Sequence, residues 1–336
     1  MTSLDEGVGA AVPKSQGAPA PPRKPLLARI PDTAPLAVLL IGLVVFFSIK
    51  SEFFLNYDNF LNILTAMAIA GIIAAPATLL LVGGQFDLSV GSALTFAGVT
   101  MAYVSEREGL FAGVVCAVLA GVAIGCINGF LVTVVGVNPL ITTLGTLAAF
   151  VGLARVLAEG QTLPVAHFSG LGTSRPLLDI PLPVLIFAVV MIAFFLVMRY
   201  TVFGRSMYAI GANPVAARLA GIRTGRLVFV AFLLSGLCVA LAALINVSQL
   251  GAASTNAGNG LELSVITAVV LGGASLAGGR GAIVGTLFGL LVIAVLNNGL
   301  TLLNVNSFWQ DVARGTLLIL AVSFDQLRLR FSDAAR

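Results

Sequence analysis

Long apolar segments alternate with short polar ones along most of the chain. A helix needs about 17–25 apolar residues to cross the hydrocarbon core of a bilayer. Breaks at charges, Gly/Pro clusters and polar loops delimit ten candidate spans: Ala34–Ile49, Phe60–Val82, Val90–Val104, Leu110–Val135, Pro139–Ala158, Pro181–Met198, Leu227–Leu250, Leu261–Leu276, Ile283–Leu303 and Phe308–Phe324. The pattern predicts an all-α, polytopic membrane protein with about ten transmembrane helices.

Two of these segments, the third and the eighth, are weak spans, and each adjoins a glycine-rich stretch. The stretches are Gly83-Gly84 and the run from Gly272-Gly273 to Gly285. We expect some helices to be interrupted there, which is tolerated only where protein or a cavity surrounds the backbone. Interrupted helices at corresponding places of two half-repeats often mark a translocation path. Close packing through small residues is the alternative explanation.

The amino-acid composition also indicates that most of the chain lies in a lipid bilayer. Hydrophobic residues make up 58% of the 336 residues and charged residues only 10%, whereas soluble domains carry about 25% charged residues. The net charge of +4 gives no reason to expect nucleic-acid binding. Cys116, Cys126 and Cys238 lie in apolar runs without a CxxC or Cys/His cluster, so neither a disulfide framework nor a metal site is indicated.

The distribution of charge predicts the orientation, because cytoplasmic loops carry an excess of Lys and Arg. Residues 1–33, rich in Pro, Ala, Ser and Gly, are expected to be a disordered cytoplasmic tail that is retained, since no cleavage site follows the first apolar run. With ten spans both termini are cytoplasmic. The basic residues that then lie inside are Arg199, Arg205, Arg218, Arg223, Arg226, Arg280, Arg328, Arg330 and Arg336, and the acidic residues outside are Glu52, Asp58, Glu106, Glu108, Glu159 and Asp179.

The chain lacks the residues of an enzyme. No GxxxxGK[ST] motif occurs, so we do not expect it to hydrolyse a nucleotide by the P-loop mechanism. The single histidine, His167, falls in a predicted outward loop, and no nucleophile–base–acid set is visible. We therefore assign no catalytic residue and no metal ligand.

Charged residues within the predicted membrane domain are scarce, and Asp87 is the one that we single out as a functional candidate. It lies between the second and third spans, and such residues are functional candidates by default. Its carboxylate can instead cap the third helix by accepting backbone N–H bonds near Ser89 and Val90. The sequence leaves both roles open.

Four ordered motifs resemble those of permease subunits of ribose/xylose-type ABC sugar importers, in the branched-chain permease superfamily. The likeness extends from about Phe60 to Asp325. The motifs are Gly83–Gly91 (GGQFDLSVG), Asn128–Thr133 followed by Pro139–Thr146, Thr201–Ile222 (TVFGRSMYAIGANPVAARLAGI), and Glu262–Gly299 with LGGASLAGGRGAIVGT and LNNG inside it.

The resemblance implies a permease domain over residues 34–328, a cytoplasmic coupling loop over residues 199–226, and a cytoplasmic tail over residues 329–336. Within the loop, Asn213 suits an N-cap, Pro214 the first turn, and Gly221 the position that ends the helix. Val215 stands where the family often has an acidic residue. The residues expected to couple to an ATPase are Asn213, Pro214, Ala216, Ala217, Arg218 and Gly221. An ordinary basic cytoplasmic loop is the alternative.

The resemblance also implies the partners and the cargo. We expect a multi-pass subunit of the plasma (bacterial inner) membrane that moves a ribose- or xylose-like monosaccharide by alternating access. ATP and Mg²⁺ are expected on separate ATPase subunits, with an extracytoplasmic solute-binding protein and a second permease subunit, identical or related. Candidate path residues are Asp87, Asn128, Thr142, Thr143, Thr146, Asn297 and Asn298, each of which could instead form interhelical hydrogen bonds.

Rival functions remain open at this point. An ABC permease for a nucleoside, inositol or a branched-chain amino acid is the nearest. An ion-coupled secondary carrier is less well supported, because one Asp is a thin basis for a proton relay. A passive channel would need neither ATP nor an ion gradient.

Overall fold

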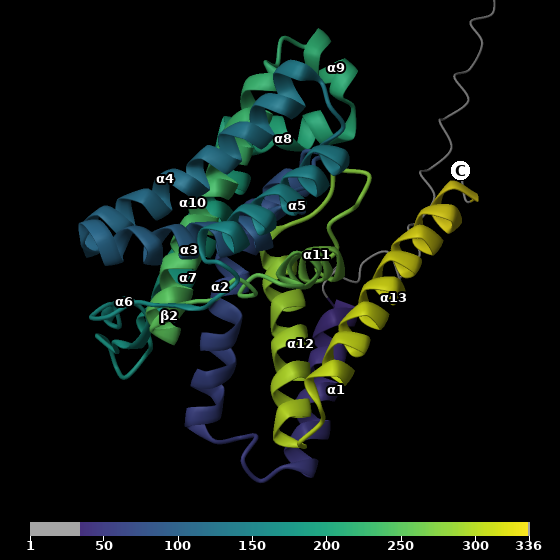
Figure 1. Ribbon diagram of the computed structural model, residues 1–336. Coiled ribbons are helices and arrows are strands. Elements are labelled where there is room, and N and C mark those ends of the chain that lie inside the picture. The colour runs from purple at the N-terminus through teal and green to yellow at the C-terminus, as the bar shows by residue number, and fades with distance from the viewer. Residues whose placement is uncertain (1–33, 335–336) are drawn as a thin grey trace, which may run out of the picture. The chain divides into compact units, whose positions relative to one another are not determined.

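The computed structural model describes residues 34–334, so the predicted tail over residues 1–33 lies outside the described part. The chain is helical with one very short strand pair, β1 (Leu163–Pro164) and β2 (Ala252–Ala253), which pair antiparallel. The helices, labelled in Figure 1, are α1 (Ala34–Lys50), α2 (Tyr57–Val82), α3 (Val90–Glu108), α4 (Leu110–Phe130) with its π-helical extension η2 (Leu131–Val135), α5 (Pro139–Leu157), α6 (Gly170–Thr173), α7 (Leu182–Tyr200), α8 (Val202–Ala212), α9 (Pro214–Leu219), α10 (Thr224–Leu250), α11 (Leu261–Leu271), α12 (Ile283–Leu302) and α13 (Ser307–Ala334).

Each apolar segment expected to span the membrane overlaps a helix. Among the described residues, six helices are long and apolar enough to cross a bilayer: α2, α4 with η2, α5, α7, α10 and α12. α1 and α11 are apolar but shorter. The all-helical, multi-pass character is therefore confirmed.

The eighth predicted segment, Leu261–Leu276, is helical only in its first part. An interruption was expected at its glycine-rich stretch, and α11 stops at Leu271, just before Gly272. The physical reason is contact between backbones: a Cβ added at Gly272 would lie 2.5 Å from the carbonyl carbon of Gly285 in α12. The chain leaves the helix where the two segments touch, and it stays non-helical until Ile283.

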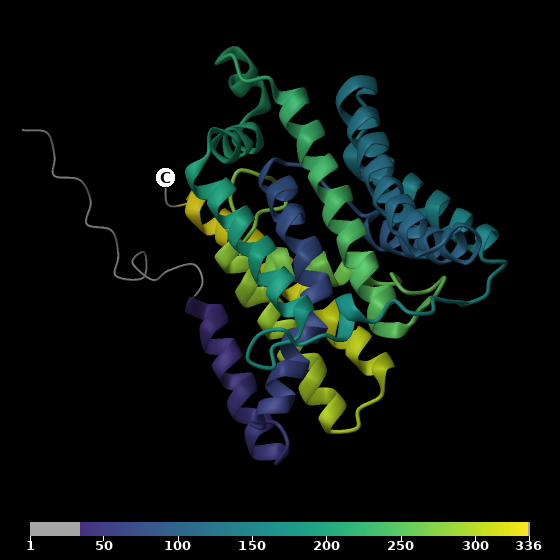
Figure 2. The same cartoon turned by 90° about the vertical axis from the view of Figure 1, so that its left-hand side faces the viewer.

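α2 and α10 form the centre of the packed core. α2 packs against α7, α10, α11 and α12, and α10 packs against α4 and α3. Figure 2 shows α7 beside α2, and Figure 1 shows α1 beside α12. The largest fully buried side chains include Ile72 and Leu79 of α2 and Phe232 and Ile245 of α10. By contrast, α4 and α5 present large apolar side chains outward, among them Phe111 and Val156, as expected of surfaces that face lipid.

α4 and α10 approach each other through glycine. A Cβ added at Gly236 of α10 would collide with the carbonyl oxygen of Gly121 and come within 3.1 Å of Gly125 Cα, both on α4. Small residues at such crossings let two backbones meet, which is how helices gain packing energy in lipid without a hydrophobic driving force.

Gly236→Ala is expected to destabilise the protein by about 1–3 kcal/mol, because the added methyl group overpacks this crossing. The measurement is thermal unfolding of the purified protein in detergent. Gly152→Ala on α5 is the matched control, since nothing lies within 4 Å of a Cβ at that position. Equal melting temperatures for the two variants would contradict the close packing of α4 on α10.

Candidate functional site

A cavity of about 370 Å³, which we name the polar cavity for the amides and hydroxyls in its otherwise apolar lining, lies between α2, α11 and α12. Its apolar wall is made of alanines, Met67, leucines and Ile293, and its polar lining is made only of amides and hydroxyls. The polar lining residues are Asn62 of α2, Ser264 of α11, and Asn297, Asn298 and Thr301 of α12. Ligand pockets for small molecules have this size and mixture of walls.

The two neighbouring asparagines of α12, Asn297 and Asn298, differ in their hydrogen bonding. Asn298 exchanges hydrogen bonds with Asn59 of α2, at 2.8 and 3.0 Å, so it ties α12 to α2. The Oδ1 atom of Asn297 is buried without a hydrogen-bond partner among the described residues. A buried acceptor without a donor costs free energy, so Asn297, which also lines the cavity, is the lining side chain whose hydrogen bonding is incomplete in this conformation.

A charged side chain, Arg314, hydrogen-bonds to one wall of the cavity, and the sequence analysis did not identify it. Arg314 of α13 donates from Nη1 to the Ser264 hydroxyl at 2.8 Å, and its Nη2 lies 2.9 Å from Asp311 Oδ1. Two opposite charges three residues apart inside the last predicted span were the available signal, because intramembrane charges are functional candidates.

Asp87 lies in a separate, fully hydrogen-bonded centre. Its Oδ1 accepts from the Ser89 backbone N–H at 3.0 Å and from the Ser89 hydroxyl at 2.6 Å. Its Oδ2 accepts from the Ser235 hydroxyl of α10 at 2.9 Å. The bond expected from Ser89 is present. The one expected near Val90 is not found in the described residues, and hydroxyl groups take its place.

The same network reaches α4 and α5. Asn128 Nδ2 donates to the Ser89 hydroxyl at 2.8 Å, and the Thr146 hydroxyl donates to Asn128 Oδ1 at 2.9 Å. Asp87, Asn128 and Thr146, candidates chosen separately from the sequence, thus form one chain of hydrogen bonds. A buried network of this kind rigidifies the elements that it joins.

Thr142 and Thr143 lie outside this network. Both side chains are buried on α5. The Thr143 hydroxyl donates to its own helix, at Pro139 O, and the Thr142 hydroxyl has no partner among the described residues. The seven candidate path residues therefore fall into three groups: the Asp87 network, the α5 threonines, and the asparagines of the polar cavity.

The two Gly-Gly pairs noted in the sequence have the same local geometry. After α2, Gly84 N donates to Leu81 O and Gln85 N to Leu80 O; after α11, Gly273 N donates to Val270 O and Ala274 N to Val269 O. Gly84 and Gly273 have φ values of +73° and +89°. Both helices thus end in a Schellman motif, which needs a left-handed residue that glycine supplies at low cost.

α9 has the caps that the sequence predicted. Asn213 Oδ1 accepts from the backbone N–H groups of Val215 and Ala216, each at 3.0 Å. At the other end Gly221, with φ of +84°, and Ile222 donate to the carbonyls of Arg218 and Ala217. Caps at both ends hold this six-residue helix in a defined geometry.

α9 exposes an apolar edge. Val215 and Leu219, four residues apart, are 59% and 85% exposed, whereas Ala217 is buried against the protein. Ala216 and Arg218 are exposed beside them. Residues four apart lie on one face of a helix, so the surface offered for contact is Val215 and Leu219, flanked by Ala216 and Arg218.

α8 joins α9 to the end of α2 and to the segment that follows α11, through a cluster that we name the glycine junction: Gly84, Gly211, Gly278 and Gly279. A Cβ at Gly211 would collide with Val82 O, and a Cβ at Gly278 would lie 3.0 Å from Gly84 Cα. Gly279 N donates to Val82 O at 2.8 Å, and Tyr208 of α8 donates to Gly281 O at 2.7 Å. The end of α8 is therefore in backbone contact with the segments that follow α2 and α11.

The helices and their outward apolar side chains define a multi-pass membrane protein. Residues 59–322 match the family described as "Branched-chain amino acid transport system / permease component". The chain belongs to this family of ABC-importer permeases, and the resemblance that its motifs indicated is confirmed.

Its relatives include named sugar permeases. The ribose import permease protein RbsC of Escherichia coli (strain K12) is 37% identical over 295 residues, 86% of this chain and 92% of the relative. RbsC of Bacillus subtilis (strain 168) is 40% identical over 297 residues, 85% and 90% of the two chains. The L-arabinose transport system permease protein AraH of E. coli (strain K12) is 36% identical over 296 residues, 86% and 90%. No solved structure matches the chain.

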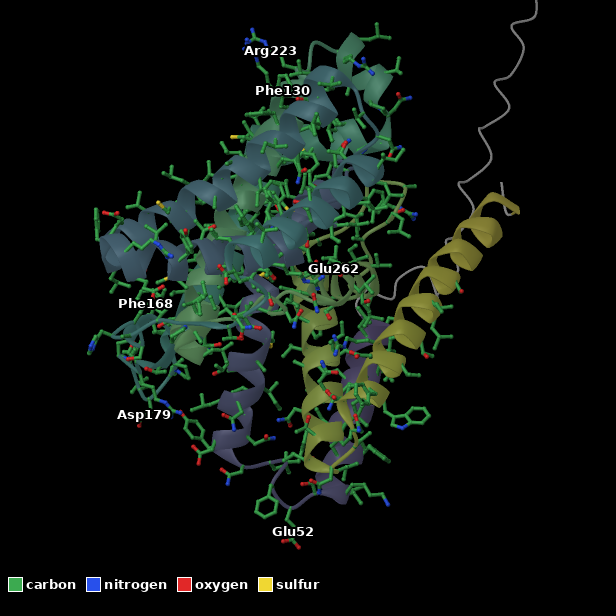
Figure 3. The ribbon with its side chains drawn as sticks, viewed as in Figure 1. Glu52, Phe130, Phe168, Asp179, Arg223 and Glu262 are labelled. Carbon is green, nitrogen blue, oxygen red and sulfur yellow. The ribbon has the colours of Figure 1, made fainter. Side chains whose placement is uncertain are left out.

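Asp87→Asn is expected to lower the free energy of unfolding by about 1–3 kcal/mol, because the new amide cannot accept all of the hydrogen bonds that the two carboxylate oxygens accept. Chemical or thermal unfolding in detergent measures the change. Asp179→Asn, in an exposed loop (Figure 3), is the control and should leave stability unchanged. A wild-type melting temperature for Asp87→Asn would contradict a structural role for the network.

Proposed function

We propose that the chain is the membrane-spanning permease subunit of an ATP-driven importer of a ribose- or xylose-like monosaccharide, located in the bacterial inner membrane. Family membership supports the class of transporter, and relatives named for ribose and L-arabinose support the class of cargo. The single observation that carries the assignment of the site is the amide- and hydroxyl-lined cavity between α2, α11 and α12.

The chemistry of that cavity suits a neutral polyol. A sugar needs hydrogen-bond donors and acceptors on one side and apolar surface for its C–H faces on the other. No ionisable side chain is among the residues that line the cavity. An amino acid would need partners for its ammonium and carboxylate groups, so the lining favours a sugar over a branched-chain amino acid.

The orientation follows from the placement of charge. Arg223 lies at the opposite end of the helices from Glu52 and Asp179 (Figure 3). With the basic end in the cytoplasm, both termini are cytoplasmic when α1, α3, α11 and α13 enter the membrane beside the six long spans. The acidic end then faces the solute-binding protein.

α9 is the contact for the ATPase subunit, which binds ATP and Mg²⁺ and hydrolyses the nucleotide. Val215 and Leu219 supply apolar surface, and Arg218 a charge. Asn213, Pro214 and Gly221 fix the ends of the helix so that it moves as a unit. The buried Ala217 packs α9 against the rest of the permease.

The glycine junction provides a route from α9 to the cavity. Movement of α8 would be passed by backbone contact to the end of α2 and to the segment before α12, and both of these helices line the cavity. ATP binding would then favour one of two conformations by differential contact with the ATPase. A second permease subunit, identical or related, would complete the path.

Uptake by proteoliposomes containing the permease, its ATPase and its binding protein tests this function. ATP-dependent uptake of one or more monosaccharides is expected from a panel of ribose, xylose, arabinose, inositol, a nucleoside and leucine. Uptake driven by an ion gradient without the ATPase would indicate a secondary carrier instead. ATP-driven uptake of leucine alone would overturn the assignment of a sugar.

Asn297→Leu is expected to reduce sugar uptake at least tenfold, because it removes an amide from the lining of the cavity and fills part of its volume. The measurement is the initial rate of uptake, with ATPase binding as a check on assembly. Thr316→Val on α13 is a control for an exposed hydroxyl that bonds only to its own helix. Unchanged uptake by Asn297→Leu would remove the cavity from the path.

Leu219→Asp is expected to weaken binding of the ATPase subunit at least tenfold without unfolding the permease, because the side chain is exposed and a charge disrupts an apolar contact. Co-purification at rising salt and detergent measures the affinity. Leu178→Asp matches it in exposure on the acidic side and should bind the ATPase normally. Normal ATPase binding by Leu219→Asp would refute α9 as the contact.

A further inference from the structure

A second cavity, of about 730 Å³, opens where α7 meets α8, away from the polar cavity described above. Its exposed rim carries Arg199, Tyr200 and Arg205, and its buried floor is formed by Met198 and by Ile283 of α12. Figure 2 shows α7 leading into α8 and α9 at this end of the chain. The cavity thus combines two cations with an apolar base at the end of a helix long enough to span a membrane.

Among the residues that the structure describes, no acidic side chain neutralises the positive charge of this rim. No acidic residue occurs between Asp179 and Glu262, and neither Arg199 nor Arg205 forms an ion pair within residues 34–334. Arg205 Nη1 donates to Tyr200 O at 3.3 Å, which leaves its other donors available. Two arginines that line one cavity can bind an anionic group with several oxygen atoms.

Tyr208 completes the site as a neutral group. Burial raises the pKa of its phenol, and the positive charge of Arg199 only partly offsets this effect. Near neutral pH the phenol therefore keeps its proton, which it donates to Gly281 O. Its oxygen does not cancel the charge of the arginines.

An apolar stripe leads from the middle of α7 to this rim. Val189, Ile192 and Leu196 are exposed on one face, and their spacing continues to Arg199 and Tyr200. Phe195 packs edge-on against the Tyr200 ring, with centroids 6.3 Å apart. On a membrane-spanning helix this stripe faces the acyl chains of lipids. A single lipid molecule could therefore place its acyl chain along the stripe and its anionic headgroup at the arginines of the rim.

We propose that the α7–α8 cavity binds the phosphate headgroup of a net anionic phospholipid, whose acyl chain lies along the α7 stripe. Basic pockets between transmembrane helices on the cytoplasmic side bind such headgroups. The assignment of the inner leaflet rests on the orientation proposed above; the binding site itself rests on the cavity, its charge and the stripe. A bound lipid would join α8 to the start of α12, next to the glycine junction.

The test measures lipid binding to the purified full chain in a neutral detergent. Phosphatidylglycerol and phosphatidylcholine with identical acyl chains are titrated, with native mass spectrometry and the melting temperature as readouts. Phosphatidylglycerol should bind more tightly, raise the melting temperature more, and lose this advantage as salt increases.

Arg199→Gln and Arg205→Gln should each weaken phosphatidylglycerol binding about fivefold, as expected for loss of one basic contact at a membrane surface. Arg223→Gln removes an exposed arginine outside the cavity (Figure 3) and should have no effect. Equal binding of the two lipids by the wild type, or an equal loss in Arg223→Gln, would overturn the proposal. So would displacement of the lipid by the ATPase subunit, since the rim would then belong to that interface.

This experiment is independent of transport. A chain that carries no sugar but prefers phosphatidylglycerol through Arg199 and Arg205 would overturn the proposed function and keep the lipid site. A chain that imports sugar without any lipid preference would overturn the lipid site alone.

Discussion

Every backbone polar group in a membrane domain needs a partner within the protein, and this constraint governs the parts of the chain that matter for function. The chain leaves helical geometry after α2 and again after α11. Each time, a glycine in the left-handed conformation lets the next N–H groups bond back to the helix that has just ended. The backbone N–H of Gly279, in the segment after α11, then donates to Val82 O at the end of α2. Each of these two backbone groups thus has a hydrogen-bond partner within the protein. Only residues without side chains allow the two segments and α8 to come this close.

Some polar groups of the interior have hydrogen-bond partners within the protein and others have none among the described residues. We assign a structural role to the first set and a binding role to the second. Asp87, Ser89, Asn128, Thr146 and Ser235 use one another's donors and acceptors, so they join α3, α4, α5 and α10 and leave little capacity for a ligand. In the cavity between α2, α11 and α12, Asn297 retains a buried acceptor without a partner. The amides and hydroxyls that line this cavity can bond to a ligand, and this makes the cavity the better site for a sugar.

Much of the functional region was predictable from local patterns. The caps of α9 follow from Asn213, Pro214 and Gly221, because capping depends on residues only a few positions apart. The helical segments follow from apolar length. The union of Asp87, Asn128 and Thr146 in one network was not predictable, since it depends on how α3, α4 and α5 cross. The role of Arg314 was missed for the same reason: it contacts Ser264, fifty residues away along the chain.

The sequence by itself determined that the chain is a helical membrane protein of the ABC-importer permease family, because apolar length, charge bias and ordered motifs are properties of the linear chain. Only the tertiary structure decided that the two asparagines of α12 have different roles, that α11 ends against Gly285, and that α8 meets both the end of α2 and Gly278-Gly279. Those outcomes depend on distances between segments far apart in sequence. Such distances are set by packing, and no periodicity within a single helix records them.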